Sequence, residues 1–374
     1  MASKLFTIAT AKYSRALILQ SLLEREGVKC ILVNVNLLQP DASSGVKVKV
    51  NEKDLEKGMK IASRLKIEFG EDLPKNDVPN LTRILIPVDF SEFSKNASRF
   101  ALNVARNYPG SELRLLYVYY APEMDTIPYS ETYIFSGPVT EQGNEIRERA
   151  QSNIENLSKE LKNEIQKQGI QGVKVDYNLV QGSAAESILY FAESYHPDLI
   201  VVGAKGSGMR DSFLGSSTMR VVLKAHFPVL VIPENTRFES KKKEYNLMYA
   251  TNFDEADFIA ISKLMRLMSK FKVKIFCTHI GTMAKDPLEK MKMEGLKNYF
   301  TENYPDVKIS CQIIESENII TGLDKFISEN SIDILSLTTH RRNLLNKIIN
   351  PSLTKKIFFQ TNIPLLVFHA GFSL

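Results

Sequence analysis

The feature that most constrains the fold is an internal repeat that begins after residue 82. The stretch RILIPVDFSEFSKNASRFALNVARNY (83–108) matches YNLMYATNFDEADFIAISKLMRLMSKF (245–271), and HPDLIVVGAKGSGMRDSFLGSSTMRVVLKAHFPVLVIPEN (196–235) matches SIDILSLTTHRRNLLNKIINPSLTKKIFFQTNIPLLVFHA (331–370). Each copy alternates apolar, strand-like runs with helical patterns, which is typical of a parallel sheet with right-handed crossovers. Because a long repeat marks a repeated structural unit, we predict two tandem α/β domains.

The chain divides into four predicted segments. Residues 1–68 show the order β-α-β-β-α of a small α+β domain, and the alternating run VKVKV within it is typical of a half-buried strand. Residues 69–82 have the Pro, Gly and charge content of a linker. Two doubly wound parallel-sheet domains are expected at 83–238 and 244–374, joined by a basic, solvated connection at 239–243.

Composition excludes several classes of partner. The net charge is +5 and the basic residues are scattered, whereas nucleic-acid binding usually needs a basic stripe. The three cysteines, Cys30, Cys277 and Cys311, are odd in number and form no CxxC, which disfavours a disulfide framework or a zinc site and favours a reducing cytosol. No apolar run reaches the length of a membrane span or a signal peptide. We therefore expect a cytoplasmic protein without a metal site, nucleic acid or membrane partner.

A glycine-rich loop follows the predicted strand DLIVV in the first copy. Gly203, Gly206 and Gly215 precede Ser216 and Ser217, which open the next helix. Ligands of open parallel sheets bind at the carboxyl ends of strands, and helix N-termini present free N–H groups that suit phosphate. Strand-to-helix turns also carry glycine for geometry alone, and a serine there is often only a cap. The loop by itself leaves phosphate binding and a plain turn as equal alternatives.

Three further residues end neighbouring predicted strands in this copy. Asp89 follows the first strand, where its carboxylate could accept hydrogen bonds from a ribose or a base, or could cap the next helix, for which Ser91 is the expected N-cap. Val118 and Val202 could form apolar walls for a purine, or could be plain core residues.

Residues 82–234 resemble a universal stress protein domain, which has an adenine nucleotide alpha hydrolase-like fold. The resemblance rests on ILIPVDFSEFS, VQGSAAESI and DLIVVGAKGSG…FLGSS…PVLVIPE. It implies an adenine pocket from Pro87, Val88, Asp89, Val118 and Val202, and phosphate and ribose contacts from Gly203, Gly206, Gly215, Ser216 and Ser217, with Lys205 either adding charge to the phosphate site or pointing to water. The implied ligand is ATP or another adenine nucleotide, with or without Mg²⁺.

The loop departs from the family pattern in one respect. The nucleotide-binding branch has nine residues between its second and third glycines, but only residues 207–214, which are eight, separate Gly206 from Gly215. The shortening is either absorbed at the tip of the loop or draws Gly206 away from the phosphates.

The second copy serves as an internal control. At the positions of Asp89, Gly203, Gly206 and Gly215 it carries Asn252, Thr338, Arg341 and Pro351. A proline there has no N–H to donate, and the other side chains occupy space that a ligand would need. We therefore predict that the second domain has lost the pocket.

The resemblance also implies how the copies associate. Universal stress protein domains commonly pair through their last strands, here PVLVIPE (228–234) and PLLVFHA (364–370). Pairing would cover two apolar edges and give an intramolecular pseudo-dimer, and a homodimer of the chain is a further possibility.

The first segment resembles the small prokaryotic signal-transducing domain, which is PII-like and ferredoxin-like. The similarity rests on Leu22–Leu23–Glu24 before Glu26–Gly27, on Val33–Asn34, and on VKVKV before an acidic helix start.

Three functions are compatible with these patterns. The first is a regulatory protein that binds an adenine nucleotide and signals to an unknown protein partner through the N-terminal domain or the loop at 121–143. The second is a slow ATPase or self-phosphorylating protein, but the chain has no GxxxxGK[ST], HRD or DFG motif, so we name no catalytic residue. The third is a nucleotide-free scaffold, for which the short glycine loop is the best support.

Overall fold

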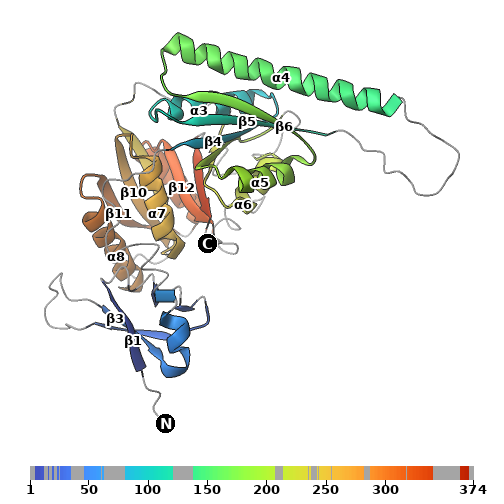
Figure 1. Cartoon of the computed structure of the whole chain (residues 1–374). Helices are drawn as coiled ribbons and strands as arrows, with labels where there is room; N and C mark the ends of the chain where they lie inside the picture. Colours follow the sequence, from blue (N-terminus) through green and yellow to red (C-terminus); the bar gives the residue numbers. More distant parts are fainter. Residues whose placement is uncertain are drawn as a thin grey trace, which may run out of the picture.

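The computed structural model is organised around a sheet of ten strands and a separate sheet of three (Figure 1). It describes residues 5–11, 16, 19–20, 23–24, 26–34, 46–59, 61–62, 81–120, 138–206, 214–234, 236, 242, 244–253, 255–281, 287–316, 318–339 and 363–369. Among these residues, no helix is both long and apolar enough to cross a membrane.

The N-terminal segment forms the small sheet. Its strands are β1 (Leu5–Ala11), β2 (Cys30–Asn34) and β3 (Val46–Asn51), which pair antiparallel in the order β1-β3-β2 and are followed by the short helix η1 (Glu52–Asp54). Val48 and Val50 alternate toward a core that also contains Leu19 and Leu23. The alternation of VKVKV is therefore a correct strand signal, while the ferredoxin-like assignment stays a prediction.

The first half of the large sheet is parallel, as predicted. Its elements are β4 (Arg83–Val88), α3 (Glu92–Ala105), β5 (Glu112–Tyr119), α4 (Pro138–Gln168), β6 (Lys174–Gln181), α5 (Ala184–Tyr195), β7 (Leu199–Gly203), α6 (Ser216–Lys224) and β8 (Val229–Ile232). In the strand order β8-β7-β4-β5-β6, the chain passes from β4 to β5 in one direction across the sheet and from β7 to β8 in the opposite direction. Such a reversal leaves a crevice at the carboxyl ends of the strands.

The second half follows the same plan. It consists of β9 (Tyr245–Ala250), α7 (Glu255–Leu267), β10 (Val273–Gly281), α8 (Pro287–Asn303), β11 (Lys308–Glu315), α9 (Ile319–Glu329), β12 (Ile334–Thr339) and β13 (Leu365–His369). Its strands run parallel in the order β13-β12-β9-β10-β11.

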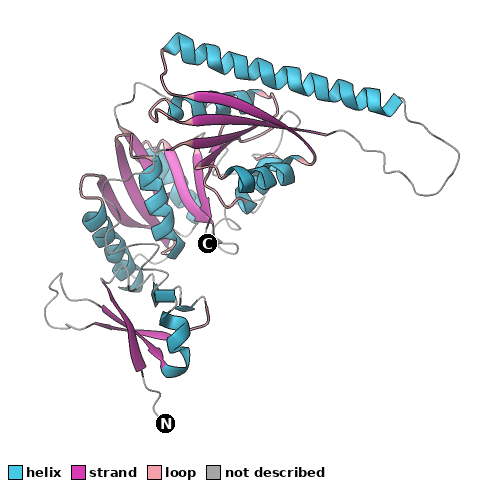
Figure 2. Cartoon of the chain, in the orientation of Figure 1, coloured by secondary structure: helices cyan, strands magenta, loops and turns pink. Residues whose placement is uncertain are grey.

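The last strands of the two halves meet in an antiparallel pair. Leu366 of β13 lies opposite Leu230 of β8, and the two halves thereby share one continuous sheet. Helices cover both faces of this sheet (Figure 2). Apolar side chains of α3, α4, α7 and α8 form the core on one face, and those of α5, α6 and α9 form the core on the other.

The helix α4 corrects one sequence expectation. We expected a loop over 121–143, but α4 already begins at Pro138 and runs along β5 and β6 (Figure 1). Proline is favoured in the first turn of a helix because its missing N–H needs no partner there. The remainder of the expected loop, 121–137, lies outside the described residues.

Equivalent aspartates fasten the first strand of each half. Asp198 Oδ2 accepts hydrogen bonds from Thr82 N (2.8 Å), Thr82 Oγ1 (2.9 Å) and Arg83 N (3.0 Å) before β4. Asp333 Oδ2 accepts from Asn246 N (2.8 Å) in β9. Asp198 also reaches the other half, with its Oδ1 3.6 Å from Arg266 of α7.

Asp198→Ala is expected to lower the free energy of unfolding by about 1.5 kcal/mol, because three donors lose one shared acceptor. Urea unfolding followed by circular dichroism measures this change. Asp176→Ala is the matched control, since the Asp176 side chain is 58% exposed and its ion pair with Arg114 should contribute less than about 1 kcal/mol. Equal losses in the two variants would contradict the structural role of Asp198.

His369 makes a buried polar contact between the halves. Its Nε2 donates to the carbonyl of Val222 in α6, at 2.6 Å. Burial lowers the pKa of His369 to about 4. The unfolded chain takes up this proton near pH 6.5, so the contribution of neutral His369 to stability is complete above pH 6.5 and is lost as the pH falls toward 4.

We therefore expect His369→Gln, which can still donate to Val222, to flatten the decline in stability between pH 6.5 and pH 4. Thermal unfolding of both proteins across this range is the measurement. An unchanged acid dependence in the variant would show that other groups cause the decline.

Candidate functional site

A cavity of about 250 Å³ opens at the carboxyl ends of β4, β5 and β7, beside the start of α6. The structure brings every residue of the expected nucleotide site to this one cavity. Its lining includes Pro87, Val88, Asp89, Val118, Val202, Gly203, Lys205, Gly206, Gly215, Ser216 and Ser217. The convergence follows from the topology, because parallel strands end at the same edge of the sheet.

The inner wall of the cavity is apolar. Val202 is nearly fully buried and Leu116 of β5 is completely buried, both in the core on the face of α5 and α6, and the partly buried Val118 packs against this core. Val118 and Val202 therefore line the cavity and also pack in or against the core, so the two roles considered for these valines are not exclusive. Such a surface suits a flat, weakly polar ring.

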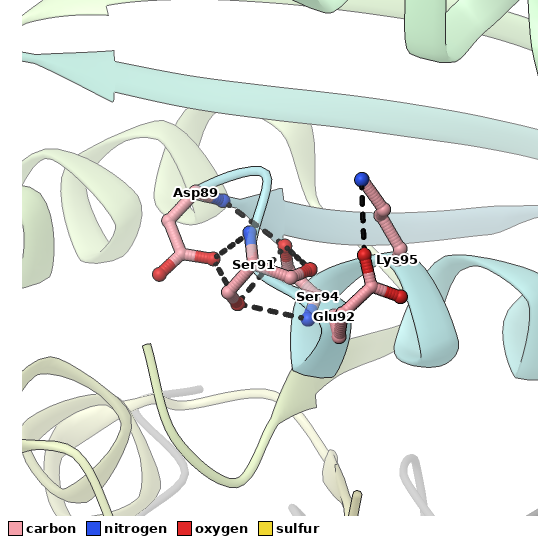
Figure 3. A network of polar contacts seen from close by, with 5 residues as sticks. All are labelled: Asp89, Ser91, Glu92, Ser94 and Lys95. Carbon is pink, nitrogen blue, oxygen red and sulfur yellow. Dashed lines mark hydrogen bonds and ion pairs between the residues drawn. The ribbon is translucent and has the colours of Figure 1, made fainter. Parts of the chain in front are cut away.

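Asp89 is held at the mouth of the cavity by the turn before α3 (Figure 3). Its Oδ1 accepts hydrogen bonds from Ser91 N (3.1 Å) and Ser91 Oγ (2.5 Å). Ser91 is the N-cap of α3, as predicted, and its Oγ accepts from Ser94 N at 3.2 Å. The carboxylate therefore orients the capping residue rather than capping the helix itself.

The other carboxylate oxygen lies against the glycine loop. A Cβ atom at Gly206 would come within 2.5 Å of Asp89 Oδ2, a separation that real Cβ atoms do not show. Any other residue at 206 would therefore force the Asp89 carboxylate to move from its observed position. Asp89, directly after the end of β4, therefore lies in close contact with the loop after β7, at Gly206.

Gly203 has a packing role. A Cβ there would lie 2.8 Å from the carbonyl carbon of Phe93, so glycine lets β7 approach the first turn of α3. Thr218 Oγ1 donates to the Gly203 carbonyl at 3.0 Å, which ties the end of β7 to α6.

The two ends of the loop are fastened to each other. Gly215 N donates to the Ala204 carbonyl at 2.9 Å, and Gly215 is the N-cap of α6. The Gly215 N–H is therefore hydrogen-bonded within the protein, whereas the amides of Ser216 and Ser217, in the first turn of α6, have no carbonyl partner within the helix. Gly206 stays beside Gly215 despite the eight-residue spacing, while the intervening tip, 207–213, lies outside the described residues.

Sequence reasoning missed part of the lining. The additional residues are Ser94, Leu116, Ala184, Ile188 and Val221. Ser94 lies one turn into α3, and Ala184 and Ile188 lie at the start of α5, directly after the VQGS stretch. These three residues lie early in a helix that directly follows a strand, and this position in the sequence is the signal that could have identified them.

In the second half, the positions equivalent to the lining residues Val88, Ser94 and Gly203 carry buried polar side chains. Together with Tyr249 they form the buried polar cluster, which we define as Tyr249, Thr251, Asp257 and Thr338. Asp257 is 2% exposed and occupies the position of Ser94, since Asn252 N bonds its Oδ2 as Asp89 N bonds Ser94 Oγ.

Three hydroxyl groups complete the cluster. Asp257 accepts from Tyr249 OH (2.8 Å) and Thr251 Oγ1 (2.6 Å), and Tyr249 OH bonds Thr338 Oγ1 (2.6 Å). Burial, and then the neighbouring Asp257 carboxylate, raise the pKa of Tyr249 well above its usual value. Thr338 stands where the first half has Gly203. Arg341 and Pro351, which were also expected to close this pocket, lie outside the described residues.

The fold and the cavity define a parallel α/β protein with a crevice at the strand ends. The sequence pattern of the universal stress protein family matches residues 80–233. A universal stress protein of Methanocaldococcus jannaschii is 31% identical over 168 residues, which cover 44% of this chain and 86% of that protein. The chain therefore belongs to the universal stress protein family, as the resemblance of residues 82–234 predicted.

Two further similarities agree with this assignment. A second universal stress protein of the same organism is 30% identical over 164 residues, covering 40% of this chain and 93% of that protein. The crystal structure of a universal stress protein from Archaeoglobus fulgidus matches 78% of this chain and 97% of that chain with a TM-score of 0.58 and 16% identity. At this identity the structural match supports the fold alone.

Proposed function

We propose that this protein is a regulatory universal stress protein that binds ATP or another adenine nucleotide in its first α/β half. The observation that carries the proposal is the convergence, in one cavity, of an apolar wall, one carboxylate and the first turn of α6. These are the three environments that a base, a ribose and a phosphate chain require.

In this proposal the adenine ring lies against Val88, Val118 and Val202. The ribose hydroxyls donate to Asp89, whose position is fixed through Ser91. The phosphates lie at the N-terminus of α6, where helix N–H groups favour negative charge. The cavity volume of about 250 Å³ is below the roughly 300–1,000 Å³ of typical ligand pockets, so we assign it to the nucleoside and direct the phosphates outward.

Mg²⁺, where present, would be held by the phosphates. The described residues include no group of three His, Cys, Asp or Glu side chains that could hold a metal ion. Magnesium usually keeps several waters and binds through substrate phosphates, which is compatible with this arrangement.

The second half is proposed to act as a pseudo-dimer partner. The support is the β8–β13 pair together with the contact of His369 with Val222 in α6. Because α6 begins at the proposed phosphate site and ends against the second half, a change at the cavity has a short route to the partner domain. An unidentified partner protein would then bind differently to the nucleotide-bound and nucleotide-free forms.

A nucleotide-free scaffold is the competing function. It is favoured by the shortened loop and by the commitment of the Gly215 N–H to Ala204. Slow ATP hydrolysis has weaker support, since Asp89 Oδ1 is engaged in the turn before α3 and so is poorly placed as a general base.

The test is to denature the purified full chain and identify any released small molecule by absorbance and mass spectrometry. Titration of the ligand-free protein with ATP, with and without Mg²⁺, follows by calorimetry, with GTP as the control for base selectivity. Released adenine nucleotide, or micromolar binding of ATP but not of GTP, supports the proposal. No heat at millimolar ATP would reject it in favour of the scaffold.

A further inference from the structure

Two of the three cysteines lie opposite each other in the second half. Cys277 of β10 is the register partner of Cys311 of β11, and both thiols are free. The first half has Leu115 opposite Tyr177 at the corresponding place, so the fold does not require a thiol pair here. The pairing joins residues that are distant and unrelated in the sequence.

The spacing of the two residues suits a disulfide. Neighbouring strands lie about 4.8 Å apart, and the Cα atoms of disulfide-bonded cysteines are about 4.4–6.8 Å apart. Both side chains point to the same face of the sheet, where Cys277 belongs to the core and Cys311 packs against it. The two thiol groups are close enough for each to shift the pKa of the other. Little movement is therefore needed to join the sulfur atoms.

The two thiols differ in access and in acidity. Cys277 is fully buried, while Cys311 is partly exposed on β11, the edge strand of the sheet. The neighbouring Cys277 thiol lowers the pKa of Cys311, and the charge of Lys297 on α8 acts in the same direction. The neighbouring Cys311 thiol, with burial, raises the pKa of Cys277. Cys311 is thus the reactive thiol and Cys277 the resolving one.

We propose that Cys311 and Cys277 form a peroxide-oxidised dithiol site. The Cys311 thiolate attacks one oxygen of hydrogen peroxide, the O–O bond breaks, and the leaving hydroxide takes up a proton to give water and a sulfenic acid on Cys311. The Cys277 sulfur then attacks Cys311, the S–O bond breaks, and a second water leaves as the disulfide forms. The dithiol loses two electrons and peroxide is reduced to two waters.

The site is reversible. A disulfide is opened by thiol–disulfide exchange, in which a thiolate attacks one of its two sulfur atoms. An added dithiol reductant returns two electrons and two protons and restores both thiols. Oxidation would fasten the edge strand β11 covalently to β10.

The experiment treats the full-length protein with a small excess of hydrogen peroxide, blocks remaining thiols with iodoacetamide, and maps the tryptic peptides by mass spectrometry. We expect free thiols to fall from three to one per chain, a linked peptide pair containing Cys277 and Cys311, and full recovery with dithiothreitol. Retention of all three thiols, a Cys311–Cys311 link between chains, or Cys311 sulfinic acid without a link would each overturn the proposal.

Variants separate the roles of the two thiols. Cys30→Ser is the matched control and should form the link at the wild-type rate, since Cys30 lies in the N-terminal sheet. In Cys277→Ala, Cys311 should accumulate a sulfenic acid that dimedone traps. In Cys311→Ser, oxidation of the buried Cys277 should be at least tenfold slower, and equal rates would contradict the assignment. The measurement on the wild-type protein decides the proposal even if a variant fails to fold.

Discussion

Asp89→Ala is expected to weaken ATP binding at least tenfold. The proposed ribose hydrogen bond to this carboxylate is charge-assisted, and such bonds contribute about 1.5–3 kcal/mol, where about 1.4 kcal/mol corresponds to a factor of ten. Calorimetric titration of ATP into the wild-type and variant proteins measures the change. Circular dichroism must show that the variant is folded, because Asp89 also orients the Ser91 cap of α3.

Two further variants make this test specific. Asp89→Asn copies Asn252 of the second half and keeps an oxygen for Ser91, so a loss of affinity there reports the ligand contact rather than the turn. Glu92→Ala removes a neighbouring carboxylate that is exposed and pairs with Lys95, and it should leave the affinity unchanged (Figure 3). If the folded Asp89→Ala protein binds ATP with wild-type affinity, Asp89 does not contact the nucleotide.

Asp257→Ala should lower the free energy of unfolding by about 3 kcal/mol. The buried carboxylate accepts from two hydroxyl groups and one backbone amide, and a buried donor left without a partner costs about 1–3 kcal/mol. Urea unfolding followed by circular dichroism is the measurement. The loss should exceed that of Asp198→Ala, because the Asp198 side chain is 23% exposed and water can reach the donors that it leaves.

The matched control is Asp306→Ala, in the exposed turn before β11, which should change stability by less than about 0.5 kcal/mol. Asp257→Ser, which copies Ser94 of the first half, should recover part of the loss because its hydroxyl can still bond Asn252 N. Wild-type stability in Asp257→Ala would mean that the buried polar cluster does not hold the second half together. ATP affinity should stay unchanged in both Asp257 variants, since the proposed site lies in the first half.

Much of the fold could be predicted from the sequence, because the patterns that indicate its strands lie in short, continuous stretches. The apolar run RILIPV became β4 and the strict alternation of VKVKVN became β3, each with the predicted character. The residues expected at the strand ends of the first copy all reached one cavity, since topology alone brings the ends of parallel strands together. The early start of α4 also has a local signal in Pro138.

The remaining features depend on contacts between distant elements. Asp257 stands in the stretch FDEADF, where an acidic residue looks like ordinary first-turn charge. In the structure it is buried and accepts a hydrogen bond from Tyr249 of β9, whose hydroxyl also bonds Thr338 of β12. Gly203 suggested a phosphate contact, and the structure adds a packing reason, its approach to Phe93, that no local pattern contains. The register of Cys277 with Cys311 likewise exists only once β10 and β11 are paired.

The central claim is that one adenine nucleotide binds per chain, in the cavity of the first half. The most direct measurement is photolabelling of the full-length protein with an azido-adenine nucleotide, followed by peptide mapping, with excess ATP as competitor. The account predicts ATP-protected label on peptides of β4, β5 and the loop between β7 and α6, and none on the corresponding peptides of β9, β10 and β12. Protected label in the second half or in the N-terminal sheet, or no protected label at all, would contradict it.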